Sequence, residues 1–158
     1  MIEEGQPVPD VTLQMGDGSL LPLSQLKRPL VLYFYPKDDT SGCTAEAKDF
    51  SDLAAAFEMA GVALLGVSKN TPKEHGKFID KHGLKVPLAT DHDGSVTEAF
   101  GVWIEKSMYG RKYMGIERTT FLIDEDGRVA KAWRKVSVPG HAQAVLEAAR
   151  ALKGMKAP

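Results

Sequence analysis

The segment Pro29–Pro36 constrains the fold more than any other feature of this chain, because it is an almost unbroken apolar run bounded by prolines. Such a run is typical of a strand that is covered on both faces in a parallel sheet. We therefore expect this strand at the centre of a sheet. A second apolar run, Val62–Ser68, predicts a buried neighbouring strand, and the helical pattern over 43–60 predicts the crossover between the two.

The remaining pattern predicts an α/β fold with a central mixed sheet, helices on both sides and an N-terminal β-hairpin. The other expected elements are strands at 11–14, 20–23 and 86–89, helices at 72–82, 96–100 and 141–152, and a hairpin of strands 119–123 and 129–133. We expect the segment 101–115 to be irregular, the tail 154–158 to fray, and residues 1–158 to form one domain. This order agrees with a thioredoxin-like fold without singling it out.

Composition and charge exclude several classes of partner. Charged residues make up 26% of the chain, the formal net charge is −1, and no stripe of Lys or Arg could neutralise several phosphates. No apolar run approaches the ~18 residues that span a bilayer, and Met1–Asp10 lacks the pattern of a signal peptide. We expect a cytoplasmic protein that binds neither nucleic acid nor membranes.

The sequence offers no metal site or cofactor motif. A single cysteine cannot form an internal disulfide or a thiolate cluster. The acidic turns at 91–94 and 124–127 lack the glutamate that an EF-hand needs at its twelfth position, where Val102 and Lys135 stand instead. The histidines show no ligand spacing, and we expect them at exposed helix ends or turns; they are His75, His82, His92 and His141.

Cys43 lies in a loop that follows the carboxyl end of the predicted central strand, where sites usually lie in α/β sheets. Thr40 or Ser41 can cap the following helix, which places Cys43 among backbone N–H groups without helical partners. Such an environment brings the pKa of a cysteine from about 8.5 to roughly 3.5–7.5. Cys43 is therefore a candidate nucleophile, the alternative being a buried and inert cysteine.

Ionisation of the thiol alone lowers a reaction barrier by roughly 2 kcal/mol at most, so a catalyst also needs donors aimed at developing charge. The hydroxyl of Thr40, three residues before Cys43, is one candidate, and an arginine is the natural second. Spacing does not choose among Arg28, Arg111, Arg118, Arg128, Arg134 and Arg150. A cysteine hydrolase would need a histidine base, and the loop contains none.

The segment Tyr33–Thr44 resembles the peroxidatic segment of peroxiredoxins, whose pattern is Pro, three residues, Thr, two residues, Cys. The pattern is complete at Pro36, Thr40 and Cys43. The chain is most similar to the Q subfamily, the bacterioferritin comigratory proteins, and the resemblance continues through 61–68, 100–103 and 118–124. It implies a thioredoxin-like fold and thiol-dependent reduction of hydrogen peroxide or organic hydroperoxides.

The resemblance also assigns roles to individual residues. Cys43 would be the peroxidatic cysteine, passing through a sulfenic acid, and Arg118 would be the guanidinium partner of its thiolate. Thr40 would hydrogen-bond the thiolate and the peroxide, and Pro36 would shield the sulfur. Because Q-type relatives are often monomers, we expect a monomer.

One departure from the Q pattern is Lys48, which stands where many members carry a resolving cysteine. A one-cysteine variant must be reduced by an external thiol through a mixed disulfide: glutathione, a thioredoxin or glutaredoxin, or another small thiol. The competing interpretation is a non-enzymatic thioredoxin-like redox sensor or binding module that uses Cys43.

The sequence leaves two questions open. One is whether Glu46 belongs to the site. The other is whether the side chains of Trp103, Met108, Tyr109 and Tyr113 form an apolar rim or, as we favour, pack in the core.

Overall fold

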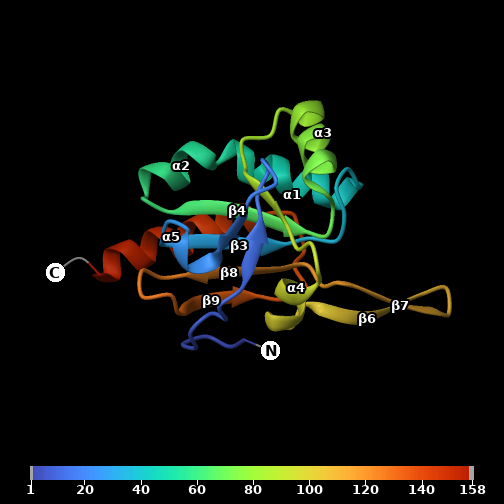
Figure 1. Cartoon of the computed structure of the whole chain (residues 1–158). Coiled ribbons are helices and arrows are strands. Elements are labelled where there is room, and N and C mark those ends of the chain that lie inside the picture. Colours follow the sequence, from blue (N-terminus) through green and yellow to red (C-terminus); the bar gives the residue numbers. More distant parts are fainter. Residues whose placement is uncertain (1, 157–158) are drawn as a thin grey trace.

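The computed structural model describes residues 2–156, with side chains described for residues 2–152. The tail at 154–158, which we expect to fray, lies outside the residues whose side chains are described. In the described part of the chain, seven strands form one sheet in the order β2-β1-β5-β4-β3-β8-β9 (Figure 1). Their bounds are β1 Thr12–Gln14, β2 Leu20–Pro22, β3 Leu30–Phe34, β4 Ala63–Ser68, β5 Leu88–Thr90, β8 Thr119–Ile123 and β9 Val129–Trp133.

The apolar run that begins at Pro29 forms the central strand β3, and all five of its residues are buried. Strand β4 pairs with β3 in parallel, with Leu30 opposite Ala63, and β8 pairs with the other edge of β3 antiparallel. The sheet is therefore mixed, and the expectations of a central position for β3 and of the second hairpin, β8–β9, are confirmed.

Side chains of β3 alternate between two separate cores, one on each face of the sheet. Val31 and Tyr33 pack with residues of α1, α2, α3 and α5, whereas Leu32 and Phe34 pack with the N-terminal strands and α4. The sheet is thus covered on both faces, as a thioredoxin-like α/β fold requires. The helices are α1 Ser41–Asp52, α2 Ala54–Met59, α3 Pro72–His82, α4 Ser95–Ala99 and α5 His141–Lys156, and a short 3₁₀-helix covers Leu23–Gln25.

The structure corrects the sequence-based prediction in two places. The helix expected over 43–60 is two helices, because the backbone leaves helical geometry at Leu53 (φ −100°, ψ 3°). The segment expected to be irregular is a hairpin of β6 (Trp103–Met108) and β7 (Arg111–Ile116), which projects beyond the rest of the fold (Figure 1). Its turn is made by Tyr109 and Gly110, both with positive φ, which suits the twist of a two-residue hairpin loop.

Three of the four side chains for which we favoured core packing lie on this hairpin and are exposed, so that expectation is wrong for Met108, Tyr109 and Tyr113. Trp103, at the base of the hairpin, is partly buried against the second core. Within residues 2–156, no helix combines the length and the apolar character needed to cross a membrane.

Candidate active site

Cys43 is the third residue of α1, directly after the loop that leaves β3. Thr40 is the N-cap of this helix, and its carbonyl accepts a hydrogen bond from Thr44. Cys43 therefore lies in the first turn, where backbone N–H groups have no helical acceptor and the helix dipole favours negative charge. The residue is only 2% exposed, so its sulfur is almost wholly buried.

Arg118 reaches this sulfur from the segment between β7 and β8. Its Nη2 atom donates to Sγ of Cys43 at 3.4 Å, and its Nη1 atom donates to Oε1 of Glu46 at 2.7 Å. Burial on its own lowers the pKa of Arg118, but the charges of Glu46 and Cys43 more than offset this and raise it. The site thus keeps a permanent cation against the sulfur.

Glu46 belongs to this cluster, which settles a question that the sequence left open. Its carboxyl group is almost wholly buried, one helical turn after Cys43, and its Oε2 atom has no hydrogen-bond partner among the described residues. Burial raises the pKa of Glu46 to about 7, although Arg118 acts in the opposite direction. Near neutral pH this carboxyl therefore carries less than a full negative charge. It neutralises the Arg118 guanidinium only in part, which leaves net positive charge beside the sulfur.

Thr40 and Pro36 frame the loop before the helix. The hydroxyl of Thr40 donates to the carbonyl of Lys37 at 2.9 Å and makes no capping hydrogen bond to the helix. The side chain is exposed, so its hydroxyl can rotate toward a bound molecule. Pro36 is partly buried and lines a cavity at the base of the β6–β7 hairpin.

Tyr33 supports the site from the central strand, a role that the sequence did not indicate. Its ring stacks on Phe50 of α1 at 4.7 Å between centroids, and its buried hydroxyl has no hydrogen-bond partner among the described residues. Burial raises the pKa of Tyr33, and the nearby Glu46 and Cys43 raise it further. Gly66 on β4 leaves room for this ring, because a Cβ atom there would lie 2.6 Å from Cζ of Tyr33.

A buried polar network holds the loop of the site against α3. The hydroxyl of Tyr35 donates to Oδ1 of Asp38, and Oδ2 of Asp38 lies 2.7 Å from Nδ1 of His75. The Nε2 atom of His75 donates to the carbonyl of Ala89, which leaves its Nδ1 atom facing Asp38. The backbone N–H of Asp38 also donates a hydrogen bond to Oδ1 of Asn70.

This network corrects the expectation that all four histidines are exposed, because His75 is 1% exposed. His141 is also buried, and its Nε2 atom lies 2.8 Å from the hydroxyl of Thr120. Burial, and then the charge of Arg118, lower the pKa of His141 to about 4, so it is neutral near pH 7. No hydrogen bond joins Cys43 to a histidine in the described part of the chain, so the hydrolase interpretation gains no support.

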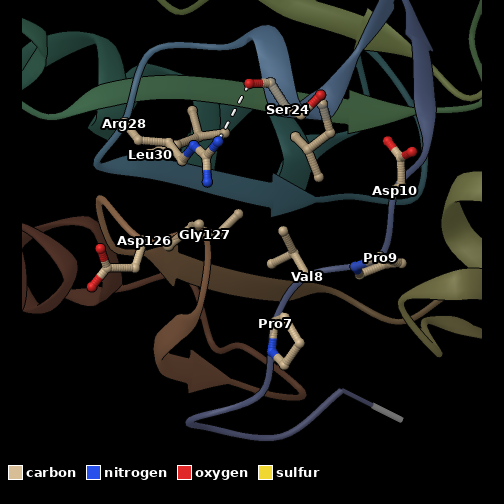
Figure 2. Close-up of a pocket in the computed structure, with 11 residues that line it drawn as sticks. Pro7, Val8, Pro9, Asp10, Ser24, Arg28, Leu30, Asp126 and Gly127 are labelled. Carbon is tan, nitrogen blue, oxygen red and sulfur yellow. Dashed lines mark hydrogen bonds between the residues drawn. The ribbon is translucent and has the colours of Figure 1, made fainter.

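A second cavity, of about 270 Å³, lies at the opposite end of the central strand (Figure 2). It is bordered by the N-terminal segment around Val8, by Leu30 at the start of β3 and by Gly127 in the β8–β9 turn, with the guanidinium of Arg28 beside it. Because Cys43 follows the other end of β3, this cavity is separate from the site. Among residues 2–152, no three His, Cys, Asp or Glu side chains are placed to share a metal ion.

Comparison with known proteins gives a consistent result. The model of the AhpC/TSA family matches residues 4–132. Peroxiredoxin Bcp of Bacillus subtilis is 48% identical over 155 residues, covering 98% of this chain and 97% of the relative. A putative peroxiredoxin bcp of Coxiella burnetii is 48% identical over 146 residues, covering 92% and 97%.

Solved structures agree in fold. The bacterioferritin comigratory protein of Xanthomonas campestris, in a study of its alkyl peroxide reduction activity, is 43% identical with a TM-score of 0.87, covering 96% of this chain and 99% of that one. A PrxQ mutant of Xylella fastidiosa is 39% identical with a TM-score of 0.89, covering 96% and 97%. The single cysteine of the present chain occupies the site described above.

Proposed function

The chain belongs to the peroxiredoxin family, in its Bcp/PrxQ branch and as a one-cysteine variant, and from this premise we propose that it reduces hydrogen peroxide and organic hydroperoxides at Cys43. One observation carries the proposal: an arginine that is 75 residues away in sequence donates to Sγ of Cys43. The alkyl peroxide reduction named for the Xanthomonas campestris relative supports organic hydroperoxides as substrates.

In the first step, the Cys43 thiolate attacks one oxygen of the hydroperoxide. A sulfur–oxygen bond forms, the oxygen–oxygen bond breaks, and the departing oxygen takes up a proton to leave as water or an alcohol. The products are the Cys43 sulfenic acid and the reduced peroxide. Negative charge grows on the departing oxygen, so a fixed donor beside the sulfur stabilises the transition state.

The surrounding residues have distinct roles in this step. Arg118 stabilises the thiolate and faces the developing charge with a guanidinium that does not titrate in the relevant pH range. Thr40 turns its hydroxyl from the Lys37 carbonyl toward the bound peroxide. Pro36 limits the access of water to the sulfur. The contact between Arg118 and the sulfur supports the first of these roles, and the family resemblance supports those of Thr40 and Pro36.

The second step needs another molecule. With one cysteine in the chain, the sulfenic acid cannot form an internal disulfide. An external thiol attacks it, water leaves, and a second thiol then releases the Cys43 thiolate from the mixed disulfide. Glutathione with glutaredoxin, or thioredoxin, would supply these electrons.

The test is peroxide consumption by the purified protein with dithiothreitol as reductant. We expect turnover by the natural protein and none by Cys43→Ser, while Lys48→Ser, at an exposed position on α1, keeps the rate. Slow oxidation of Cys43 to a stable adduct, at the rate of an ordinary thiol, would instead favour the redox-sensor interpretation. Equal rates of peroxide consumption by the natural protein and Cys43→Ser would contradict the peroxidase function.

A further inference from the structure

A cavity of about 300 Å³ lies between the loop of the site and the base of the β6–β7 hairpin. Pro36, from the loop that leads to Cys43, lines this cavity, and Trp103, Tyr113 and Met114 provide apolar walls. Among residues 2–152, the charged side chains that line it are two lysines, Lys69 and Lys106. A volume of this size is at the lower end of the range for small-molecule pockets.

Neither lysine is neutralised locally. Within residues 2–152, no carboxylate lies within ion-pair distance of Lys69 or Lys106. Lys69 places Nζ 3.5 Å from the ring centroid of Trp103, which keeps its ammonium over the apolar wall of the cavity. Lys106 is partly buried and lies against Gly115, where the absence of a Cβ leaves room for its aliphatic chain.

Lys106 also lies within electrostatic reach of the sulfur. Burial and then the charge of Arg118 lower the pKa of Lys106, whereas the thiolate of Cys43 and, less strongly, Glu117 act in the opposite direction. The thiolate is therefore part of the negative charge that balances this group of cations. When Cys43 becomes a sulfenic acid, that charge is lost, and an anion gains most from the cavity at this stage of the cycle.

We infer that Lys69 and Lys106 form a carboxylate-binding subsite beside Cys43, which takes a small anionic thiol as the molecule that reduces the sulfenic acid. This inference rests on the proposed peroxidase function and extends it to the choice of reductant. The thiol RSH reacts with Cys43–SOH to give Cys43–S–S–R and water. A second thiol R′SH then gives the Cys43 thiol and the disulfide RSSR′.

A series of small thiols of similar size tests the subsite: mercaptopropionate is anionic, mercaptoethanol is neutral and cysteamine is cationic. Peroxide-oxidised protein is mixed with each thiol at concentrations far below saturation, and the recovery of the Cys43 thiol is followed, with rates expressed per thiolate. We expect mercaptopropionate to react about fivefold faster than mercaptoethanol and cysteamine to react more slowly than both, since an exposed ion pair contributes up to about that factor.

The ratio of the mercaptopropionate rate to the mercaptoethanol rate is the decisive quantity, because a general effect of a substitution on the sulfur cancels in it. We expect this ratio to fall to about one in Lys106→Gln and to fall in part in Lys69→Gln. The matched control is Lys112→Gln, which removes an exposed lysine of the same hairpin outside the cavity, and there the ratio should not change. High salt should reduce the ratio in the natural protein.

A ratio near one in the natural protein, or an equal fall in Lys112→Gln, would overturn the subsite. The lysine variants can also be compared in their rates of oxidation by linoleic acid hydroperoxide and by tert-butyl hydroperoxide. If Lys106→Gln lowers only the rate with linoleic acid hydroperoxide and leaves the thiol ratio unchanged, the subsite binds the substrate and the assignment to the reductant is overturned. The same thiol series on the neutral dithiopyridine adduct of Cys43 requires no peroxide. If hydrogen peroxide does not oxidise Cys43, the proposed function fails. If the thiol ratio on the adduct is near one, the subsite fails, so the two failures are distinguished.

Discussion

The Nη1 atom of Arg118 lies 2.7 Å from Oε1 of Glu46, so the guanidinium that contacts the sulfur is anchored by an almost wholly buried carboxyl group. One arginine thereby joins the first turns of α1 to the segment before β8. The carboxyl group is more easily protonated than an exposed one, which gives this relationship a measurable dependence on pH.

The stability of the protein should fall as pH rises through the titration of Glu46. The folded-state pKa of about 7 is above the ordinary value of 4.5, so the folded protein favours the protonated carboxyl. Its stabilising contribution is full below about pH 4.5 and is lost as pH rises through about 7, by up to about 3 kcal/mol in all. In Glu46→Gln the free energy of unfolding should lose this dependence on pH. Urea unfolding between pH 4.5 and 8, with the exposed Glu58→Gln as control, measures it, and parallel pH curves for natural protein and Glu46→Gln would contradict it.

Replacement of Arg118 by alanine should lower the rate of Cys43 oxidation by about a hundredfold to a thousandfold, the loss typical when one transition-state donor is removed. Arg118→Lys should not restore the rate fully, since one ammonium cannot reach sulfur and carboxyl in the way that two guanidinium nitrogens do. Stopped-flow oxidation by hydrogen peroxide measures both. The exposed Arg150→Ala is the control, and full activity in Arg118→Ala would make Arg118 a structural residue.

The hydroxyl of Thr40 should matter for catalysis more than for stability. Because its side chain makes no capping bond to α1, Thr40→Val should cost less than about 1 kcal/mol of folding free energy. The same substitution should slow peroxide reduction by at least about tenfold, since it removes a donor to the peroxide. Thr40→Ser should recover much of the rate. A normal rate in Thr40→Val would exclude the hydroxyl from the reaction.

The Asp38 carboxyl should be a major contributor to the stability of the loop before Cys43. Asp38→Ala removes the carboxyl that both the Tyr35 hydroxyl and the His75 Nδ1 atom contact and leaves these two groups only their mutual contact at 3.3 Å, at a cost of about 3 kcal/mol. Asp38→Asn should recover most of this stability, since its amide offers an acceptor to the Tyr35 hydroxyl and a donor to the Nδ1 atom of His75. Asp39→Asn weakens only the exposed pair with Lys81 and the contact with His82, and should destabilise the protein far less than Asp38→Ala. Thermal unfolding distinguishes them, and equal effects of Asp38→Ala and Asp39→Asn would refute the distinction.

The regular elements could be predicted wherever one physical signal dominated. The run after Pro29 is apolar at every position, and a strand covered on both faces demands exactly that composition. The hairpin of β6 and β7 gave no such signal, because Ser107, Arg111 and Lys112 are exposed and no polar-to-apolar alternation marks a buried face. The end of α1 at Leu53 was also hidden, since apolar spacing continues into α2.

The site could be predicted in part. The position of Cys43 after β3 follows from the pattern, whereas Arg118 was one of six arginines until the family resemblance selected it. The sequence left open whether Glu46 belongs to the site, and it wrongly predicted that His75 is exposed. Burial of a charged or titratable side chain depends on partners that come from distant segments. Nothing in the sequence near His75 indicates that Asp38 will be opposite it.

The near-complete burial of Cys43 has a kinetic consequence for the whole cycle. A peroxide is small, but a mixed disulfide adds at least several heavy atoms to a sulfur that has almost no free surface. The first turn of α1 must therefore open each time a reductant attacks, against the contacts of Asp38 and Asp39 with α3. At saturating thiol, turnover then reaches a ceiling set by this opening rate, and the chemical identity of the reductant ceases to matter.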